Sequence, residues 1–224
     1  MSLTEQLKIE QGITAVIGGG GKTTFLRVLG DELAKAGQRV LLCTTTKILP
    51  FPELPNLISP TVEELSRELK KHRLVAIGAP VPGTGKLTAP ELPVEMLPTL
   101  ADYVLVEADG AAGRPMKAHA PHEPVIPAGA GQTIIIVGAS GFGHPIRESA
   151  HRPERYASLA EASVLDVVTP EIEARVLQAE GLHQQVLVNQ AETAEDLRTA
   201  QALAQKLTCP VWAGSLRKGE IMLC

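Results

Sequence analysis

Hydrophobic residues along the chain form short continuous apolar runs that alternate with longer segments of helical spacing. Continuous runs are typical of buried parallel strands, and helical spacing marks the amphipathic helices that cover such a sheet. The expected strands cover residues 13–17, 39–43, 74–77, 103–106, 133–137, 185–188 and 211–213. Expected helices cover 25–36, a segment beginning at 62, 170–180 and 193–207. The alternation predicts an α/β fold with a doubly wound, mainly parallel sheet.

Local signals place several helix ends. Thr61 begins a capping-box pattern, with Leu65 and Leu69 on one face of the helix that follows. Gly37 and Gly181 are expected just beyond two helix ends, because glycine adopts the left-handed conformation found there. Thr169-Pro170 suits the start of the helix that Gly181 closes, and its spacing predicts that Ile172, Val176 and Ala179 face inward.

Two segments rich in proline and glycine interrupt this alternation. Residues 78–98 are expected to form a loop or hairpin excursion, in which the Gly83-Thr84-Gly85-Lys86 stretch is not a second phosphate site. Residues 110–131 follow an acidic strand end, so they are expected to border the active site as a mobile or partner-binding loop. A solvated connector is the alternative for both. The whole chain, residues 1–224, is expected to form one domain.

The amino-acid composition argues against several classes of function. The 224 residues carry a formal charge of −4 and only 3% aromatic residues, which argues against a nucleic-acid partner. No apolar run approaches the length of a membrane span, and the first residues lack the layout of a signal peptide. Cys43, Cys209 and Cys224 are too dispersed for a disulfide framework or a zinc site. The sequence predicts a cytoplasmic protein that uses no membrane.

The strand at 13–17 runs directly into a glycine-rich stretch and then a helix. Such a loop brings backbone N–H groups and the positive end of the helix dipole to phosphate oxygens. The lysine is expected at an exposed helix start, reaching the β- and γ-phosphates, with the following threonine hydroxyl on Mg²⁺. The residues expected to bind the nucleotide are Gly18, Gly19, Gly20, Gly21, Lys22, Thr23 and Thr24.

This loop is shorter than a standard Walker A motif. Val16 stands where the first glycine of G-x-x-x-x-G-K-[ST] belongs, and the pattern present is G-x-x-G-K-T-T. That length resembles the phosphate loop of the Mur-type peptide ligases. The structural alternative is a tight turn between a strand and a helix that merely uses glycine.

An apolar strand ending in carboxylates has the form of a Walker B segment. Glu107 stands at its end and Asp109 two residues farther on, and Mg²⁺ is usually held by such carboxylates together with phosphates and water. Both are candidate catalytic and metal-binding residues beside the catalytic candidate Lys22, with Asp109 also able to orient the attacking water. Thr44, after the second strand, is a further candidate metal ligand, although a threonine run also suits strand and cap chemistry.

The remaining polar motifs indicate a function less specifically. Asn189 and Glu192 follow a strand where GTPases carry a base-reading N-K-x-D motif, so they are candidate base ligands, with ATP and GTP left open. His119 and His122 have metal-ligand chemistry, but Pro121 between them prevents the regular helical turn that would align them. Arg152, before an expected helix, can stabilise phosphate charge or form a salt bridge at the helix start.

Together these motifs resemble the YqeC family, described as accessory proteins of selenium-dependent molybdenum hydroxylases. The residues that carry the resemblance are 18–24, 44–47, 107–117, 122–127, 151–154 and 189–190. The resemblance implies a P-loop NTPase fold and a role in maturing a molybdenum enzyme or its cofactor, with selenium involved. It supplies no demonstrated reaction.

Three functions from different classes therefore remain. The favoured one is an NTP-binding and NTP-hydrolysing accessory protein whose nucleotide state gates contact with a client enzyme. The second is a ligase or small-molecule kinase of the Mur type, and the third is a nucleotide-dependent scaffold with negligible turnover.

Overall fold

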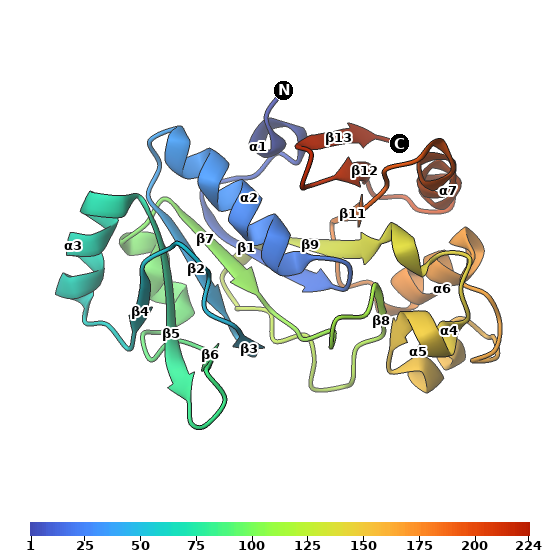
Figure 1. Cartoon of the computed structure of the whole chain (residues 1–224), viewed down its shortest axis with the longest axis horizontal. Coiled ribbons are helices and arrows are strands. Elements are labelled where there is room, and N and C mark those ends of the chain that lie inside the picture. The colour runs from blue at the N-terminus through green and yellow to red at the C-terminus, as the bar shows by residue number, and fades with distance from the viewer. The chain divides into compact units, whose positions relative to one another are not determined.

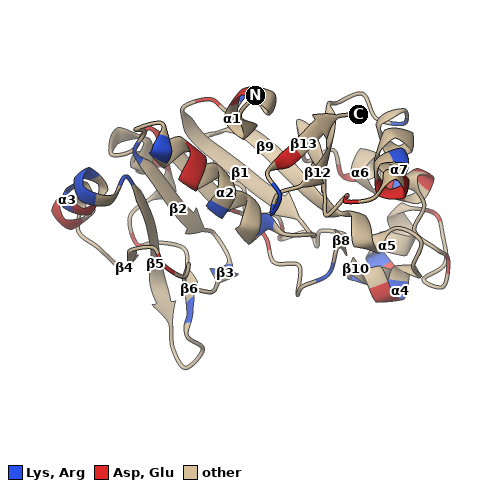
Figure 2. Ribbon diagram, turned by 45° about the horizontal axis from the view of Figure 1, so that its top comes forward, with Lys and Arg blue, Asp and Glu red and all other residues tan.

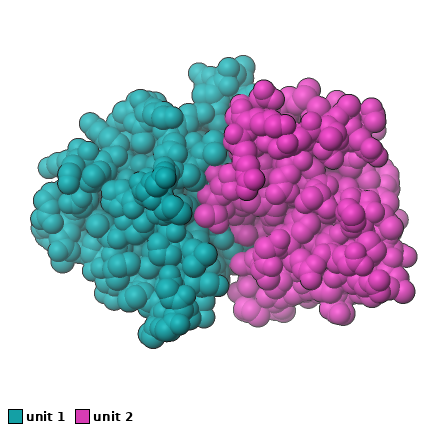
Figure 3. All heavy atoms as spheres, in the orientation of Figure 1, with its two compact units in different colours: residues 1–16, 25–109, 125–132 teal, residues 17–24, 110–124, 133–224 magenta.

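The computed structural model describes residues 1–224 and divides into two compact units (Figure 3). Unit 1 contains residues 1–16, 25–109 and 125–132. Unit 2 contains residues 17–24, 110–124 and 133–224. The expected glycine-rich loop thus belongs to unit 2, whereas the acidic strand end belongs to unit 1.

Unit 1 is built on parallel strands. Their order is β1 (Gly12–Gly18, of which residues 12–16 lie in this unit), β7 (Tyr103–Glu107), β2 (Val40–Thr44) and β5 (Leu74–Val81). The short strand β4 (Asn56–Ile58) also pairs with β5 in parallel. Register places Val16 opposite Glu107 and Glu107 opposite Thr44, so these strands end at the same edge.

The proline- and glycine-rich excursion contains a hairpin, as expected. The strand at 74–77 continues to Val81 and pairs antiparallel with β6 (Lys86–Thr88), which in turn pairs with β3 (Lys47–Ile48). Residues 82–85 form the turn, where Gly83 and Gly85 have positive φ. This stretch connects two strands and precedes no helix.

Helices cover both faces of the unit 1 sheet (Figure 1). They are α1 (Leu3–Gln6), α2 (Lys22–Lys35), α3 (Val62–His72) and the 3₁₀ helix η1 (Val94–Thr99). At Gly30 of α2, an added Cβ would lie 3.0 Å from the Leu74 side chain, so this helix approaches the sheet closely. Leu41 and Val75 pack on the other face in one core cluster with Leu65 of α3 and Leu97 of η1. The doubly wound α/β arrangement is confirmed.

Helix α3 has the ends that its sequence predicts. The Thr61 side chain accepts from the backbone N–H of Glu64, and the Glu64 carboxylate accepts from the Thr61 N–H. In Figure 2 the ribbon of α3 carries both red (acidic) and blue (basic) residues. Two acidic residues, Glu63 and Glu64, lie in its first turn, and the basic residues 70–72 lie in its last. This distribution is favourable for the helix dipole.

Unit 2 has its own parallel strands. Their order is β13 (Glu220–Leu223), β12 (Val211–Ser215), β11 (Gln185–Asn189) and β9 (Ala130–Gly138, of which residues 133–138 lie in this unit), with only β13 antiparallel to its neighbour. A separate two-stranded sheet joins β8 (Met116–Lys117) to β10 (Ala150–His151). The helices of this unit are η2 (Ala139–Gly141), α4 (Ile146–Ser149), α5 (Pro153–Leu159), α6 (Pro170–Glu180) and α7 (Ala194–Ala204).

Helix α6 begins and ends as expected but buries a different face. Thr169 caps its start and Gly181, with φ +59°, closes its end. The prediction that Ala179 faces inward is wrong, since Ala179 is exposed, while Glu173 is buried with Val176 and Leu177. The Tyr156 hydroxyl of α5 donates to the Glu173 carboxylate, and this partner allows an acidic residue to occupy an inner position.

Two further sequence expectations can be compared with the structure. No helix is long and apolar enough to cross a membrane. The three cysteines are free thiols, and Cys43 is buried in β2.

Candidate nucleotide-binding site

The four consecutive glycines of unit 2 lie against neighbouring backbone and one amide side chain. A Cβ at Gly18 would lie 2.3 Å from the Ile136 carbonyl oxygen, and one at Gly20 would lie 2.3 Å from the Gly138 nitrogen. A Cβ at Gly19 would meet the Arg114 and Pro115 carbonyl oxygens at 2.5 Å. At Gly21 it would lie 2.7 Å from Asn189 Nδ2. The glycines therefore allow this loop to fit among β9, β11 and residues 114–115, a requirement that exists before any ligand binds.

Hydrogen bonds fix the loop in the same place. The N–H of Gly19 donates to the Ile136 carbonyl at 2.9 Å, and that of Gly20 donates to the Arg114 carbonyl at 3.3 Å. The first N–H groups of an α-helix have no partner within the helix, and here that first turn begins at Lys22. The N–H groups of Gly19 and Gly20 are thus used within the protein, where they hold the loop against β9 and residues 114–115.

Lys22 is more buried than its position suggested. We expected an exposed helix start, but this lysine is 6% exposed and its Nζ donates to the Gly18 carbonyl at 2.6 Å. The side chain folds back over its own loop, which replaces water around a buried ammonium. Thr23, the next residue, is exposed.

Asn189 connects the loop to the end of β11. Its Nδ2 donates to the Gly20 carbonyl at 2.7 Å, and its Oδ1 accepts from the Leu216 N–H at 3.1 Å. The side chain is 5% exposed, so both bonds lie away from solvent. The structure therefore brings Asn189 together with the glycine-rich loop.

Glu192 has different partners. Its carboxylate accepts from Ser215 Oγ at 2.7 Å and forms an ion pair with Lys218 at 2.8 Å. Hydrogen bonds from Lys218 and Ser215 hold the pKa of Glu192 below its usual range. A base-reading role for Glu192 stays a prediction.

Within unit 2, residues 110–124 contact the glycine-rich loop, while the expectation that residues 110–131 border an active site stays a prediction. Arg114 and Pro115 contact Gly19, and the Pro115 carbonyl accepts from the Gly138 N–H at 2.9 Å. Residues 116–119 are buried, and two of them form β8. Much of this segment is thus packed structure, whereas Ala112 to Arg114 are exposed.

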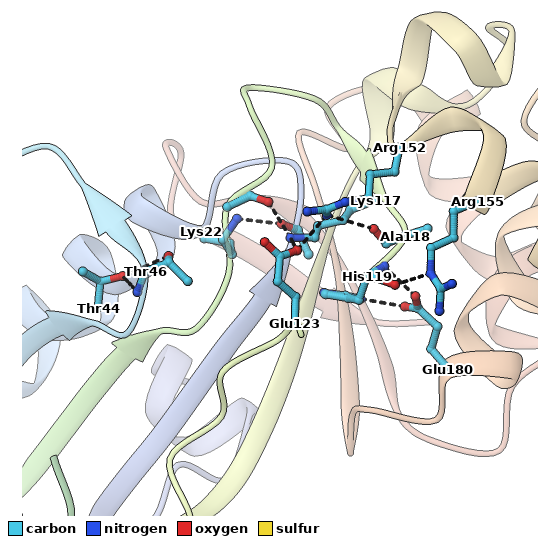
Figure 4. Close-up of polar contacts among 12 residues, drawn as sticks. Lys22, Thr44, Thr46, Lys117, Ala118, His119, Glu123, Arg152, Arg155 and Glu180 are labelled. Atoms are coloured by element: carbon cyan, nitrogen blue, oxygen red, sulfur yellow. Dashed lines mark hydrogen bonds and ion pairs between the residues drawn. The ribbon is translucent and has the colours of Figure 1, made fainter. Parts of the chain in front are cut away.

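The same segment contributes to a largely buried ion cluster (Figure 4). The Lys117 side chain is 0% exposed, and its Nζ lies 2.9 Å from Glu123 Oε2 and also donates to the Gly110 carbonyl. Arg152 Nη1 lies 2.7 Å from the same Glu123 oxygen. Arg152 therefore forms a salt bridge at the start of α5, one of the two roles expected for it.

The His119 ring forms a hydrogen bond with a carboxylate. Its Nδ1 lies 2.7 Å from Glu180 Oε2, its backbone N–H donates to Glu180 Oε1, and its carbonyl accepts from Arg155. No group of three or more His, Cys, Asp and Glu side chains lies close enough to hold a metal ion. His119 thus has hydrogen-bond partners of its own within unit 2.

In unit 1, the candidate metal ligands lie where β2 and β7 end. The Thr44 hydroxyl donates to the Glu107 carbonyl at 2.8 Å and accepts from the Thr46 N–H at 3.0 Å. Glu107 is 7% exposed and Asp109 is fully buried. Two carboxylates at a strand end match the oxygen chemistry of Mg²⁺, whereas the Thr44 hydroxyl already links two backbone groups.

Two charged residues of this region have no recognisable motif in the sequence. Lys117 was part of the stretch 107–117 that carries the family resemblance, and Glu180 was not a candidate site residue. Both are ordinary charged residues in the sequence, and their burial depends on partners 6 and 61 residues away. Lys117 belongs to the buried two-residue strand β8, and a strand of this length leaves no periodic pattern in the sequence.

Comparison with known proteins identifies the family of this chain. A model described as YqeC protein matches residues 14–154, more than half of the chain. The chain belongs to the YqeC family. The matched region contains the glycine-rich loop, the acidic strand end and the Lys117 cluster, and it stops before β11.

A relative within this family is the uncharacterized protein YqeC of Escherichia coli (strain K12). It is 29% identical over 159 residues, which cover 66% of this chain. The chain spans 60% of the length of that relative.

Two solved structures also resemble the chain. FtsY from Mycoplasma mycoides has a TM-score of 0.46 at 11% identity, covering 95% of this chain and 63% of that chain. The hydrogenase maturation factor HypB from Archaeoglobus fulgidus has a TM-score of 0.45 at 14% identity, covering 94% of this chain and 84% of that chain. Both likenesses are loose, and no functional conclusion rests on them.

Proposed function

We propose that the protein binds a nucleoside triphosphate through residues 18–24 and hydrolyses it. The observation that carries the proposal is the loop itself: four closely packed glycines lead into a helix whose first residue is a buried lysine. On binding, the Lys22 ammonium exchanges the Gly18 carbonyl for phosphate oxygens, and the first turn of α2 supplies backbone N–H groups. A mere turn between a strand and a helix would not need a cation folded over it.

Mg²⁺ is part of this proposal. Thr23, Glu107 and Asp109 are assigned to it because hydroxyl and carboxylate oxygens are the ligands that this ion prefers. Thr44 is a weaker ligand candidate, since its hydroxyl is engaged with Glu107 and Thr46. When bound, the ion would neutralise charge on the transferred phosphate. Asp109 is assigned to orienting the attacking water.

The nucleotide base is assigned to the end of β11. Asn189 lies against the loop, and Glu192 follows three residues later. A carboxylate that accepts from the guanine N1–H and 2-amino group would favour GTP, whereas adenine offers no such donors. ATP and GTP both remain candidates.

The biological role that we propose is nucleotide-dependent assistance in maturing a selenium-dependent molybdenum hydroxylase or its cofactor. Its support is the family resemblance of the site motifs, and the test is direct. A host lacking this protein should make the hydroxylase with less active cofactor, and wild-type protein should restore it while Lys22→Ala should not. Full hydroxylase activity without the protein would contradict this role.

Steady-state phosphate release from Mg-ATP and Mg-GTP tests the enzymatic part. An NTPase releases phosphate with the protein alone. A ligase or kinase releases it, or consumes nucleotide, only with an acceptor that has a carboxylate or hydroxyl. Tight nucleotide binding with no turnover in either condition would contradict hydrolysis and leave a nucleotide-dependent scaffold.

A further inference from the structure

Lys117 lies in the part of unit 2 that borders the glycine-rich loop. It follows two residues after Pro115, whose carbonyl oxygen would lie 2.5 Å from a Cβ at Gly19. Figure 4 shows the Lys22 and Lys117 side chains pointing toward one another, with the Glu123 carboxylate beside Lys117. A second buried lysine therefore lies next to the loop to which the proposed function assigns phosphate.

The cluster around Lys117 contains more positive than negative charge. One oxygen of Glu123 contacts both Lys117 and Arg152, so two cations share one carboxylate. Burial alone would raise the pKa of Glu123, but the hydrogen bonds from Arg152 and Lys117 outweigh it and keep that pKa below its usual range. Glu123 is thus ionised, and the three side chains carry a net charge of about +1, which favours a nearby anion.

We propose that the Lys117 ammonium binds the terminal phosphate of the bound nucleoside triphosphate, exchanging its ion pair with Glu123 for that phosphate. This inference rests on the proposed function. A diphosphate lacks the terminal group, so Lys117 stays with Glu123 when a diphosphate is bound. The ion pair between Lys117 and Glu123 is therefore broken when a triphosphate is bound and kept when a diphosphate is bound, so the contacts of the 110–124 segment depend on which nucleotide is present.

Arg152 and Glu123 are the positioning residues in this scheme. Arg152 precedes α5 and has a left-handed backbone, with φ of 62°, which fixes where its side chain begins. Its bond to Glu123 remains when Lys117 turns to phosphate, so the carboxylate is not left buried without a partner. Arg152 also donates to the Ala118 carbonyl at 3.4 Å and so holds the strand that carries Lys117.

The test compares calorimetric affinities for Mg-bound triphosphate and diphosphate of the same nucleoside. In Lys117→Met, the preference for triphosphate over diphosphate should fall at least about tenfold, since a charge-assisted bond is lost. Lys117→Arg keeps the charge and should keep much of the preference. Glu123→Gln removes the competing carboxylate and should raise triphosphate affinity relative to diphosphate.

Arg155→Met is the matched control. Arg155 holds the same segment through the His119 carbonyl but does not contact Lys117 or Glu123 in the described ion cluster. If it loosens the segment, both affinities should fall together and the preference should stay near the wild-type value. Thermal unfolding of each variant shows whether its fold persists.

An unchanged triphosphate preference in folded Lys117→Met would overturn the inference while leaving nucleotide binding intact. If Lys117→Met does not fold, loss of the preference in folded Lys117→Arg, or a Glu123→Gln preference at or below wild type, would overturn it instead. Absence of nucleotide binding in the wild-type protein is a different result, because it contradicts the proposed function itself.

Discussion

Asn189 Nδ2 donates to the carbonyl of Gly20 across 169 residues of sequence, at a distance of 2.7 Å. The same amide accepts from the Leu216 N–H, so one buried side chain joins the glycine-rich loop, the end of β11 and the residue after β12. The loop is therefore held in shape from β11 as well as from β9.

Asn189→Asp tests the two hydrogen bonds of this side chain separately. The aspartate can still accept from Leu216 but cannot donate to the Gly20 carbonyl, which leaves two oxygens facing one another. We expect nucleotide affinity to fall by about tenfold and the unfolding free energy by about 1–3 kcal/mol. Asn189→Ala removes both bonds and should cost at least as much unfolding free energy. Wild-type affinity in the aspartate variant, measured by calorimetry, would show that the bond to Gly20 does not shape the site.

Glu107 and Asp109 are expected to differ in role. Asp109→Asn should impair hydrolysis more than nucleotide binding, because the lost charge is the one assigned to the attacking water. Glu107→Gln should chiefly weaken the Mg²⁺ dependence of binding. Titrating Mg²⁺ in binding and phosphate-release assays separates these effects. Equal and negligible effects of the two substitutions would remove this strand end from the site.

Glu192 is the residue that we propose to distinguish guanine from adenine. For this residue to read guanine, its carboxylate must face the base while Ser215 and Lys218 hold it in place. GTP should then bind more tightly than ATP, and Glu192→Ala should erase that difference. Competition calorimetry with both nucleotides measures it. Equal affinities in the wild-type protein would exclude Glu192 from base recognition.

Glu173 makes stability depend on pH. The pKa of Glu173 is raised to about 7, chiefly by burial and also by the Glu180 charge, while the hydrogen bond from Tyr156 acts in the opposite direction. Because the folded pKa lies above the unfolded value, this group stabilises fully below about pH 4.5, and that contribution is lost as pH rises toward 7.

Denaturant unfolding at pH 5 and pH 7.5 tests this. Wild-type stability should fall across that range more than the stability of Glu173→Gln, which cannot ionise but can still accept from Tyr156. Between pH 5 and pH 7.5 the wild-type protein should lose roughly 2 to 3 kcal/mol more unfolding free energy than Glu173→Gln. Parallel pH profiles of the two proteins would show that Glu173 is not protonated in the fold.

Periodic and local signals in the sequence predicted most of the main strands and helices. The Thr61 capping box and the Gly181 helix end depend on neighbouring residues alone, and both were predicted correctly. Ala179 was placed wrongly, because the helical spacing alone cannot show that Tyr156 offers Glu173 a buried partner.

The glycine-rich loop was recognisable, but the reason for its glycines was only partly predictable. The sequence suggested that they let phosphate approach the backbone. The structure adds that Ile136, Arg114 and Gly138 already occupy the space that side chains would need. These contacts join segments far apart in the sequence, as do those of Lys117, Glu123 and Arg152, and no local pattern records them. The single-domain organisation stays a prediction.

The central claim is that Lys22 and its loop bind the phosphates of a nucleoside triphosphate. Isothermal titration calorimetry of Mg-ATP and Mg-GTP into wild-type protein and Lys22→Ala tests it most directly, with thermal unfolding as the check on folding. We expect at least one of the two nucleotides to bind the wild-type protein and Lys22→Ala to lose at least about a hundredfold in affinity for it, because the β- and γ-phosphates lose their buried cation. Equal affinity in a folded Lys22→Ala variant would contradict the account.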